Sequence, residues 1–197
     1  MKDTKPQIFI AKGKTPWYGN AWKDDYKVIK VDEPAFDKAI VTCKDVTDTS
    51  FMFNGCFFLT SLDLSSFDTS KVTTMDSMFS DCRSLTLLDL SSFDTSKVID
   101  MSYMFNDCNS LTTLDLSNFD TSNVTSMMGM FIHCSKLTTI KGIIDMKSCI
   151  DYGRIKNDSS DNRMFKDCPK LKNVKIKNPP EDFDGAGLSS SQYTIVS

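Results

Sequence analysis

The sequence predicts an α/β solenoid of about five repeats, with a parallel sheet on one face and short helices on the other. The main observation is a Met-Phe-x-x-Cys motif that recurs five times, each time followed by Leu-x-x-Leu-x-Leu or a close relative. The first four copies are 26 residues apart, and the last step is 34 residues, which is one period plus an insertion of 8. A fixed period in this range is typical of one supersecondary unit stacked on copies of itself.

The strand of each repeat is predicted by alternation. In the repeat that spans 59–84, Leu62 and Leu64 flank Asp63, so the apolar side chains point to one face and the carboxylate to the other. The same leucine positions recur in phase in the other repeats. We therefore expect the leucines to form columns in a common core.

The helix of each repeat is predicted by helical spacing. Phe67-Asp68-Thr69-Ser70 is rich in residues that cap helices, and apolar residues follow at positions i, i+3, i+6 and i+7. These are Val72, Met75, Met78 and Phe79. We expect a short helix that begins at Val72, with Asp68 and its equivalents Asp94 and Asp120 as structural caps. The Met-Phe column is predicted to lie in the core, and a Met-rich binding surface is the alternative.

The regular spacing of the cysteines favours reduced thiols. Disulfide frameworks of small secreted domains use dense, irregular spacings, whereas here one cysteine falls at the same phase of every repeat. A buried free thiol packs as a small hydrophobe. Cys43 and Cys149 are out of phase, and their pairing stays open.

Three segments are expected along the chain. Residues 1–43 form an N-terminal cap segment with short strands at 7–11 and 26–31, residues 44–177 form the repeats, and residues 178–197 form a C-terminal cap or tail. Residues 193–196 resemble a closing strand. An insertion at about 145–163 carries a polar loop, which is either a tolerated bulge or a contact surface.

Composition narrows the partners. The net charge of -3 does not favour binding to nucleic acid. The sequence contains no run of 18 apolar residues, so insertion into a membrane is not expected. The N-terminal residues lack the apolar centre of a signal peptide. We expect a chain that is cytosolic when made, or that is exported by information carried elsewhere.

The units Leu-Asp-Leu-Ser-Ser-Phe-Asp-Thr-Ser-Lys-Val and Met-Phe-x-x-Cys-x-x-Leu resemble the BspA-like leucine-rich repeats over about residues 44–177. The resemblance implies a leucine-rich-repeat-like, right-handed solenoid. Members of that family occur in bacterial surface proteins and are implicated in adhesion to host matrix or other cells. Related repeats occur in phage-encoded proteins. The resemblance therefore favours a cell-surface, extracellular or virion location.

The outward face of the sheet is the first candidate binding surface. It carries Ser61, Asp63, Asp89, Thr113 and Asp115, and the three aspartates are expected to stack in line. Like charges on adjacent strands cost free energy. Their presence favours a cation, a basic partner or hydrogen bonds from neighbouring serines, and plain solvated surface is the alternative. A weak Ca²⁺ ladder is conceivable for oxygen ligands, but no calcium motif is present, and no metal is expected.

A second candidate lies in the N-terminal segment, where Trp17, Tyr18 and Trp22 are clustered. These aromatic residues either cover the first coil or form a contact site for a glycan or a protein.

No catalytic constellation is recognised. His133 is the only histidine and occupies a turn position, and neither clustered zinc ligands nor a phosphate-binding loop is present. We expect a non-enzymatic recognition module without a cofactor that binds a protein or a glycan, most readily in surface adhesion. The alternative is a structural or receptor-binding component of a phage virion, in the tail or as a capsid decoration, with homo-oligomer contacts through residues 1–42.

Overall fold

The computed structural model describes the backbone of residues 7–12, 27–32, 38–40, 46–153 and 161–197, and the side chains of the last two ranges. All strand pairs within these ranges are parallel. The strands are β1 (Gln7–Lys12), β2 (Lys27–Asp32), β3 (Lys38–Ile40), β4 (Ser61–Asp63), β5 (Leu87–Leu88), β6 (Thr113–Asp115), β7 (Thr139–Lys141), β8 (Ile144–Asp145), β9 (Val174–Lys177) and β10 (Tyr193–Val196).

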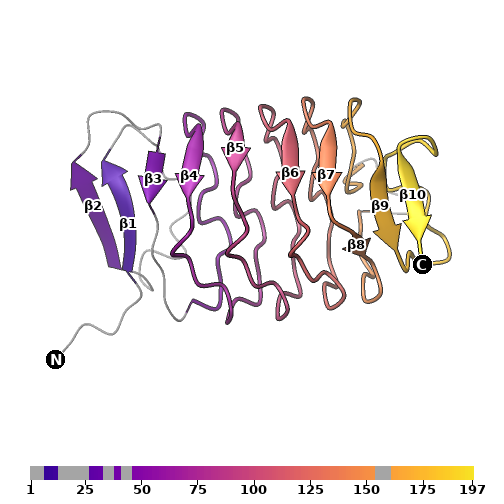
Figure 1. Ribbon diagram of the computed structural model, residues 1–197, viewed down its shortest axis with the longest axis horizontal. Coiled ribbons are helices and arrows are strands. Elements are labelled where there is room, and N and C mark those ends of the chain that lie inside the picture. Colours follow the sequence, from indigo (N-terminus) through magenta and orange to yellow (C-terminus); the bar gives the residue numbers. More distant parts are fainter. Residues whose placement is uncertain (1–6, 13–26, 33–37, 41–45, 154–160) are drawn as a thin grey trace.

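Four small sheets follow one another in a row, with β2 and β1 at one end and β10 at the other (Figure 1). Their strand orders are β1-β2, β3-β4-β5, β6-β7 and β10-β9-β8. The predicted strands at 7–11, 26–31 and 193–196 are confirmed as β1, β2 and β10.

The predicted α/β class is wrong, because the described residues contain strands and turns and no helix. The segment 72–85 is a chain of tight turns, in which the N–H groups of Met78, Cys82 and Leu85 each donate to the carbonyl three residues before. Ser77 and Asp81 have φ angles of 54° and 60°, which a right-handed helix does not allow. The turns place Val72, Met75, Met78 and Phe79 inside, and this spacing resembles one helical face.

The N–H groups that a helix would use internally bind the next coil instead. In the coil that begins at Val72, alternate N–H groups donate to carbonyls of the following coil at 2.8–2.9 Å. The four bonds run from Met75 to Asp100, from Ser77 to Ser102, from Phe79 to Met104 and from Asp81 to Asn106. On this turn side, isolated parallel bridges also join each coil to the next, in a series that begins at Asp48 and ends at Asp151. Each coil is therefore hydrogen-bonded to its neighbours on two sides, through the strands and through the turns.

The core is the column of repeated apolar residues, as predicted. The Met-Phe pairs from Met52-Phe53 to Met164-Phe165 are buried, which excludes a Met-rich binding surface at these positions. The five phenylalanines stack in sequence with ring centroids 5.3–5.8 Å apart and interplanar angles of 1–11°. Phe67, Phe93 and Phe119 form a second stack with centroids 5.7 and 6.3 Å apart.

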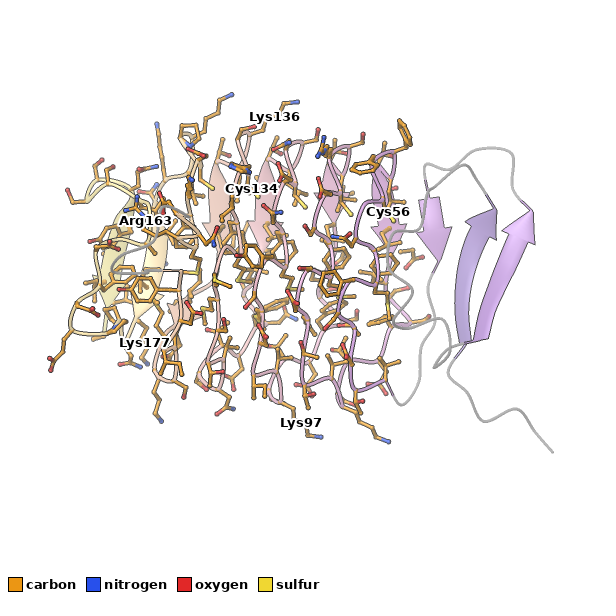
Figure 2. All side chains as sticks on the ribbon, turned by 180° about the vertical axis from the view of Figure 1, so that it is seen from behind. Cys56, Lys97, Cys134, Lys136, Arg163 and Lys177 are labelled. Carbon is orange, nitrogen blue, oxygen red and sulfur yellow. The ribbon has the colours of Figure 1, made fainter. Side chains whose placement is uncertain are left out.

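The buried cysteines are free thiols that bind the preceding coil. The six cysteines in the described residues form no disulfide. The Sγ–H groups of Cys82, Cys108 and Cys134 donate to the carbonyls of Phe53, Phe79 and Phe105 at 3.1–3.2 Å. Cys56 and Cys134 lie inside the stack, whereas Lys97 and Lys136 extend away from it at opposite edges (Figure 2). Cys43 lies outside the described residues.

The leucine column breaks at Gly142, where two backbones come close together. Gly142 has a φ angle of +98°, and a Cβ atom there would lie 2.7 Å from the carbonyl oxygen of Leu116. Only glycine fits this approach. The chain then forms β8 at the start of the expected insertion, and residues 154–160 of that insertion lie outside the described residues.

Candidate recognition surface

The outer sheet face, as we call it here, is the exposed side of β4 to β7. The backbone register places Ser61 beside Leu87, Thr113 beside Thr139 and Asp115 beside Lys141. The full set is Ser61, Asp63, Leu87, Asp89, Thr113, Asp115, Thr139 and Lys141. Ser61 is half-buried and the others are exposed. The structure thus brings five of the predicted binding residues, Ser61, Asp63, Asp89, Thr113 and Asp115, to one face.

The aspartates of this face are held by the serines that follow them. Asp63 Oδ1 accepts the N–H of Ser65 at 3.0 Å and its hydroxyl at 2.6 Å. These bonds stabilise the charged form and hold the pKa of Asp63 below its usual value. Asp89 accepts the N–H of Ser91 at 2.9 Å.

The neighbouring charges within the column oppose ionisation of the aspartates. The bonds from Ser91 lower the pKa of Asp89, while the charges of Asp115 and Asp63 raise it, and the net direction is downward. Lys141 Nζ lies 3.3 Å from Asp115 Oδ2 and ends the acidic column with a positive charge. Because the bonds from the serines outweigh the repulsion, the column stays ionised at neutral pH without a bound cation.

One apolar residue interrupts this polar face. Leu87 is 68% exposed, at the position that Ser61, Thr113 and Thr139 occupy in other coils. Phe58, just before β4, is 66% exposed. The strand alternation also predicts that Leu87 points outward on this face, although it was not named as a binding residue, and Phe58 was not predicted to make contacts. The signal for Leu87 was the exchange of a hydroxyl side chain for an apolar one at an outward position of a strand.

The second aspartate column has a structural role, but it caps no helix. Oδ1 atoms of Asp68, Asp94 and Asp120 accept the N–H two residues later, each at 3.0 Å. The buried hydroxyl of Thr69 donates to the carbonyl of Asp94 at 2.9 Å and accepts its N–H at 2.7 Å. This column therefore closes turns and ties neighbouring coils together. The prediction that these aspartates cap helices is wrong, because they lie in turns.

His133 lies between two carboxylates in the column of turn residues, as its position predicted. Its Nδ1 is 3.4 Å from Asp107 Oδ2 and its Nε2 is 3.3 Å from Asp167 Oδ2. The neighbouring Cys134 is fully buried, and burial raises the pKa of its thiol well above the usual value. A Cys-His nucleophile pair is therefore absent here. No group of three or more potential ligands suited to a metal occurs in the described part of the chain.

The predicted aromatic contact residues Trp17, Tyr18 and Trp22 lie outside the described residues. None of the segments that the structure describes forms a helix long and apolar enough to cross a bilayer.

Comparison with known families gives one match. The family described as "Mycoplasma protein of unknown function, DUF285" matches residues 33–145, which is more than half of the chain. No curated protein and no solved structure matches.

Proposed function

Because the chain belongs to the family described as "Mycoplasma protein of unknown function, DUF285", we propose that it is a non-enzymatic recognition module of the BspA-like leucine-rich-repeat kind. It binds a protein or a glycan through the outer sheet face. In this proposal residues 44–177 form the recognition stack, and residues 1–43 and 178–197 cap it. The resemblance to surface proteins favours a partner outside the cell.

The observation that carries the proposal is the rigid, regular presentation of polar groups on the outer sheet face. Outward residues of β4 and β5, and of β6 and β7, are in register, and parallel strands lie about 4.8 Å apart. The stacked core below them is fully packed. A surface that is already ordered loses little conformational entropy when a partner binds.

The chemistry of the face indicates what the partner offers. Asp63, Asp89 and Asp115 present carboxylates that accept hydrogen bonds or pair with cations. Leu87 adds an exposed apolar contact beside them. A partner with sugar hydroxyls, or with lysine or arginine side chains next to an apolar group, complements this arrangement.

The test is direct binding with a matched charge control. The purified chain is applied to a glycan array and to a panel of purified matrix proteins. A variant with Asp63, Asp89 and Asp115 all changed to Lys should lose the binding of the parent. The control changes Asp68, Asp94 and Asp120 to Lys, which alters the net charge equally and removes equivalent turn hydrogen bonds.

We expect the control to keep binding, provided that both variants keep the circular dichroism spectrum of the parent. Binding that survives the first triple substitution would place the contact outside this face. Absence of any binding by the parent to either panel would count against the recognition role.

A further inference from the structure

Among the described residues, β10 is an edge strand of its sheet. β10 pairs with β9 on one side only, and it is the outermost strand of its sheet (Figure 1). No other strand of the described residues pairs with it. Open edges present unpaired backbone groups to solvent, and they are templates for pairing with another chain.

The core is unfinished at this edge. The register places Tyr193 beside Val174 and Ile195 beside Ile176. Val174 and Ile176 are fully buried, whereas Ile195 is 57% exposed and Tyr193 is half-buried. Ile195 therefore continues a core column that no further coil of the described chain covers.

Two residues of β10 direct their backbone N–H and C=O groups to the side away from β9. The N–H of Val174 donates to the carbonyl of Gln192 at 3.0 Å, so residues 192, 194 and 196 turn their backbone toward β9. Backbone groups alternate in direction along a strand. Those of Tyr193 and Ile195 are therefore directed away from β9.

Two common protections of an edge strand, charge and proline, are missing at β10. Natural edges are blunted by charged side chains, proline or bulges. Residues 185–197 contain no charged residue and no proline. The opposite end of the stack differs, because β2 carries Lys27, Lys30 and Asp32 among its six residues.

We propose that a second copy of this chain covers the edge, through antiparallel pairing of β10 with the β10 of the partner. Two-fold symmetry at Thr194 sets Tyr193 opposite the partner's Ile195, in the hydrogen-bonded positions that their free peptide groups require. Aromatic and β-branched pairs of this kind stabilise antiparallel strands. The two Ser197 residues then lie at opposite ends of the pair.

A second copy suits the edge better than a head-to-tail contact. An isologous interface needs one self-complementary patch and closes after two subunits. The uncharged β10 meets no like charge in its own symmetry mate, whereas pairing with β2 would bring charged residues against the apolar edge. This dimer is independent of the recognition role proposed above.

The oligomeric state tests the proposal. Sedimentation equilibrium or light scattering of the full chain should give about twice the monomer mass of 22.2 kDa over a concentration series. Ile195→Lys should give the monomer mass, because it sets two cations into the apolar pairing. Ile150→Lys is the matched control, since Ile150 is 87% exposed and away from β10, and it should stay dimeric. Both variants must keep the circular dichroism spectrum of the parent, because loss of the dimer by itself lowers the melting temperature.

Cross-linking tests the register without weakening the edge. Thr194→Cys places a thiol opposite its own symmetry mate, and mild oxidation should give a disulfide-linked dimer on a denaturing gel. Ile150→Cys should not cross-link. A monomeric parent at all concentrations would overturn the proposal. So would a folded Ile195→Lys variant that remains a dimer, because the interface would then lie elsewhere.

Discussion

Replacing Phe105 by Ala tests the stacked core at its centre. Phe105 is fully buried, and its ring stacks on Phe79 at 5.8 Å and on Phe131 at 5.5 Å. Truncation of a buried phenylalanine costs about 3–5 kcal/mol in transfer free energy and cavity formation. Each stacked aromatic pair contributes about 0.5–1.5 kcal/mol beyond buried area. Because two pairs are lost, we expect a cost near 5 kcal/mol.

Two comparison variants isolate the contribution of stacking. Phe165 is equally buried but has one stacked neighbour in the column, Phe131 at 5.3 Å. Phe165→Ala should therefore cost less than Phe105→Ala, by about 0.5–1.5 kcal/mol. Phe58 is 66% exposed, and Phe58→Ala should stay within about 0.5 kcal/mol of the parent.

The assay is urea and thermal unfolding followed by circular dichroism. For a chain of this length, about 5 kcal/mol corresponds to a fall in Tm of roughly 10–20 °C. If Phe105→Ala melted like Phe58→Ala, the ring would not be in the core, and the stacked architecture would be refuted. Equal costs at Phe105 and Phe165 would instead show that stacking adds nothing to burial.

Three further predictions concern the thiols, the turn aspartates and a close contact. Cys108→Ala should cost about 1–2 kcal/mol, and equally under reducing and oxidising conditions, because the thiol is buried and unbridged. Bonds from Ser96 hold the pKa of Asp94 below its usual value, so its contribution to stability is complete above about pH 4 and is lost as pH falls through the lowered pKa. Asp94→Asn should therefore flatten the fall of Tm with acidification. Gly129→Ala should destabilise by about 1–3 kcal/mol, because a Cβ there would clash with the ring of Tyr103 and the φ angle of +61° disfavours alanine.

Each of these has its own control. For the thiols, the Ellman reagent should react slowly with the native chain and rapidly in urea, and fast native labelling of Cys108 would contradict the burial. For the carboxylates, the dependence of Tm on pH is measured for Asp94→Asn and the parent. If the two profiles match down to pH 2, ionised Asp94 does not contribute to stability. For the close contact, the double variant Gly129→Ala with Tyr103→Ser should recover part of the loss, because the strain of alanine at a φ angle of +61° remains. If the double variant is no more stable than Gly129→Ala, the cost comes from the strained backbone at residue 129 and not from the ring of Tyr103.

The stacking and the core could be predicted from the sequence, because in-phase repetition reports directly which residues become neighbours. The Met-Phe-x-x-Cys column and the leucine columns lie where the phase placed them. The outer sheet face was also predictable, since residues between the core leucines must point outward. The same alternation predicted that Leu87 points outward, although it was not named as a contact residue.

The helices could not be predicted correctly, because spacing alone does not distinguish a helix from a series of three-residue turns. The four apolar positions from Val72 to Phe79 fit both. The discriminating signal was weak: residues that tolerate positive φ recur at fixed phases, as Gly55, Asp81 and Asp107 do. Hydrogen bonds to the next coil stabilise the turns over a helix, and these bonds depend on tertiary contacts.

The hydrogen bonds from one coil to the next make length a modular property of this protein. Excision of residues 86–111 would join Leu85 to Thr112, just as Leu111 now precedes Thr112, and every left-handed turn would keep its place. Loss of any number that is not a whole coil would shift glycine, aspartate and serine away from those turns. Repeat gain or loss through recombination can therefore lengthen or shorten the outer sheet face in complete coils, without redesign of the interior.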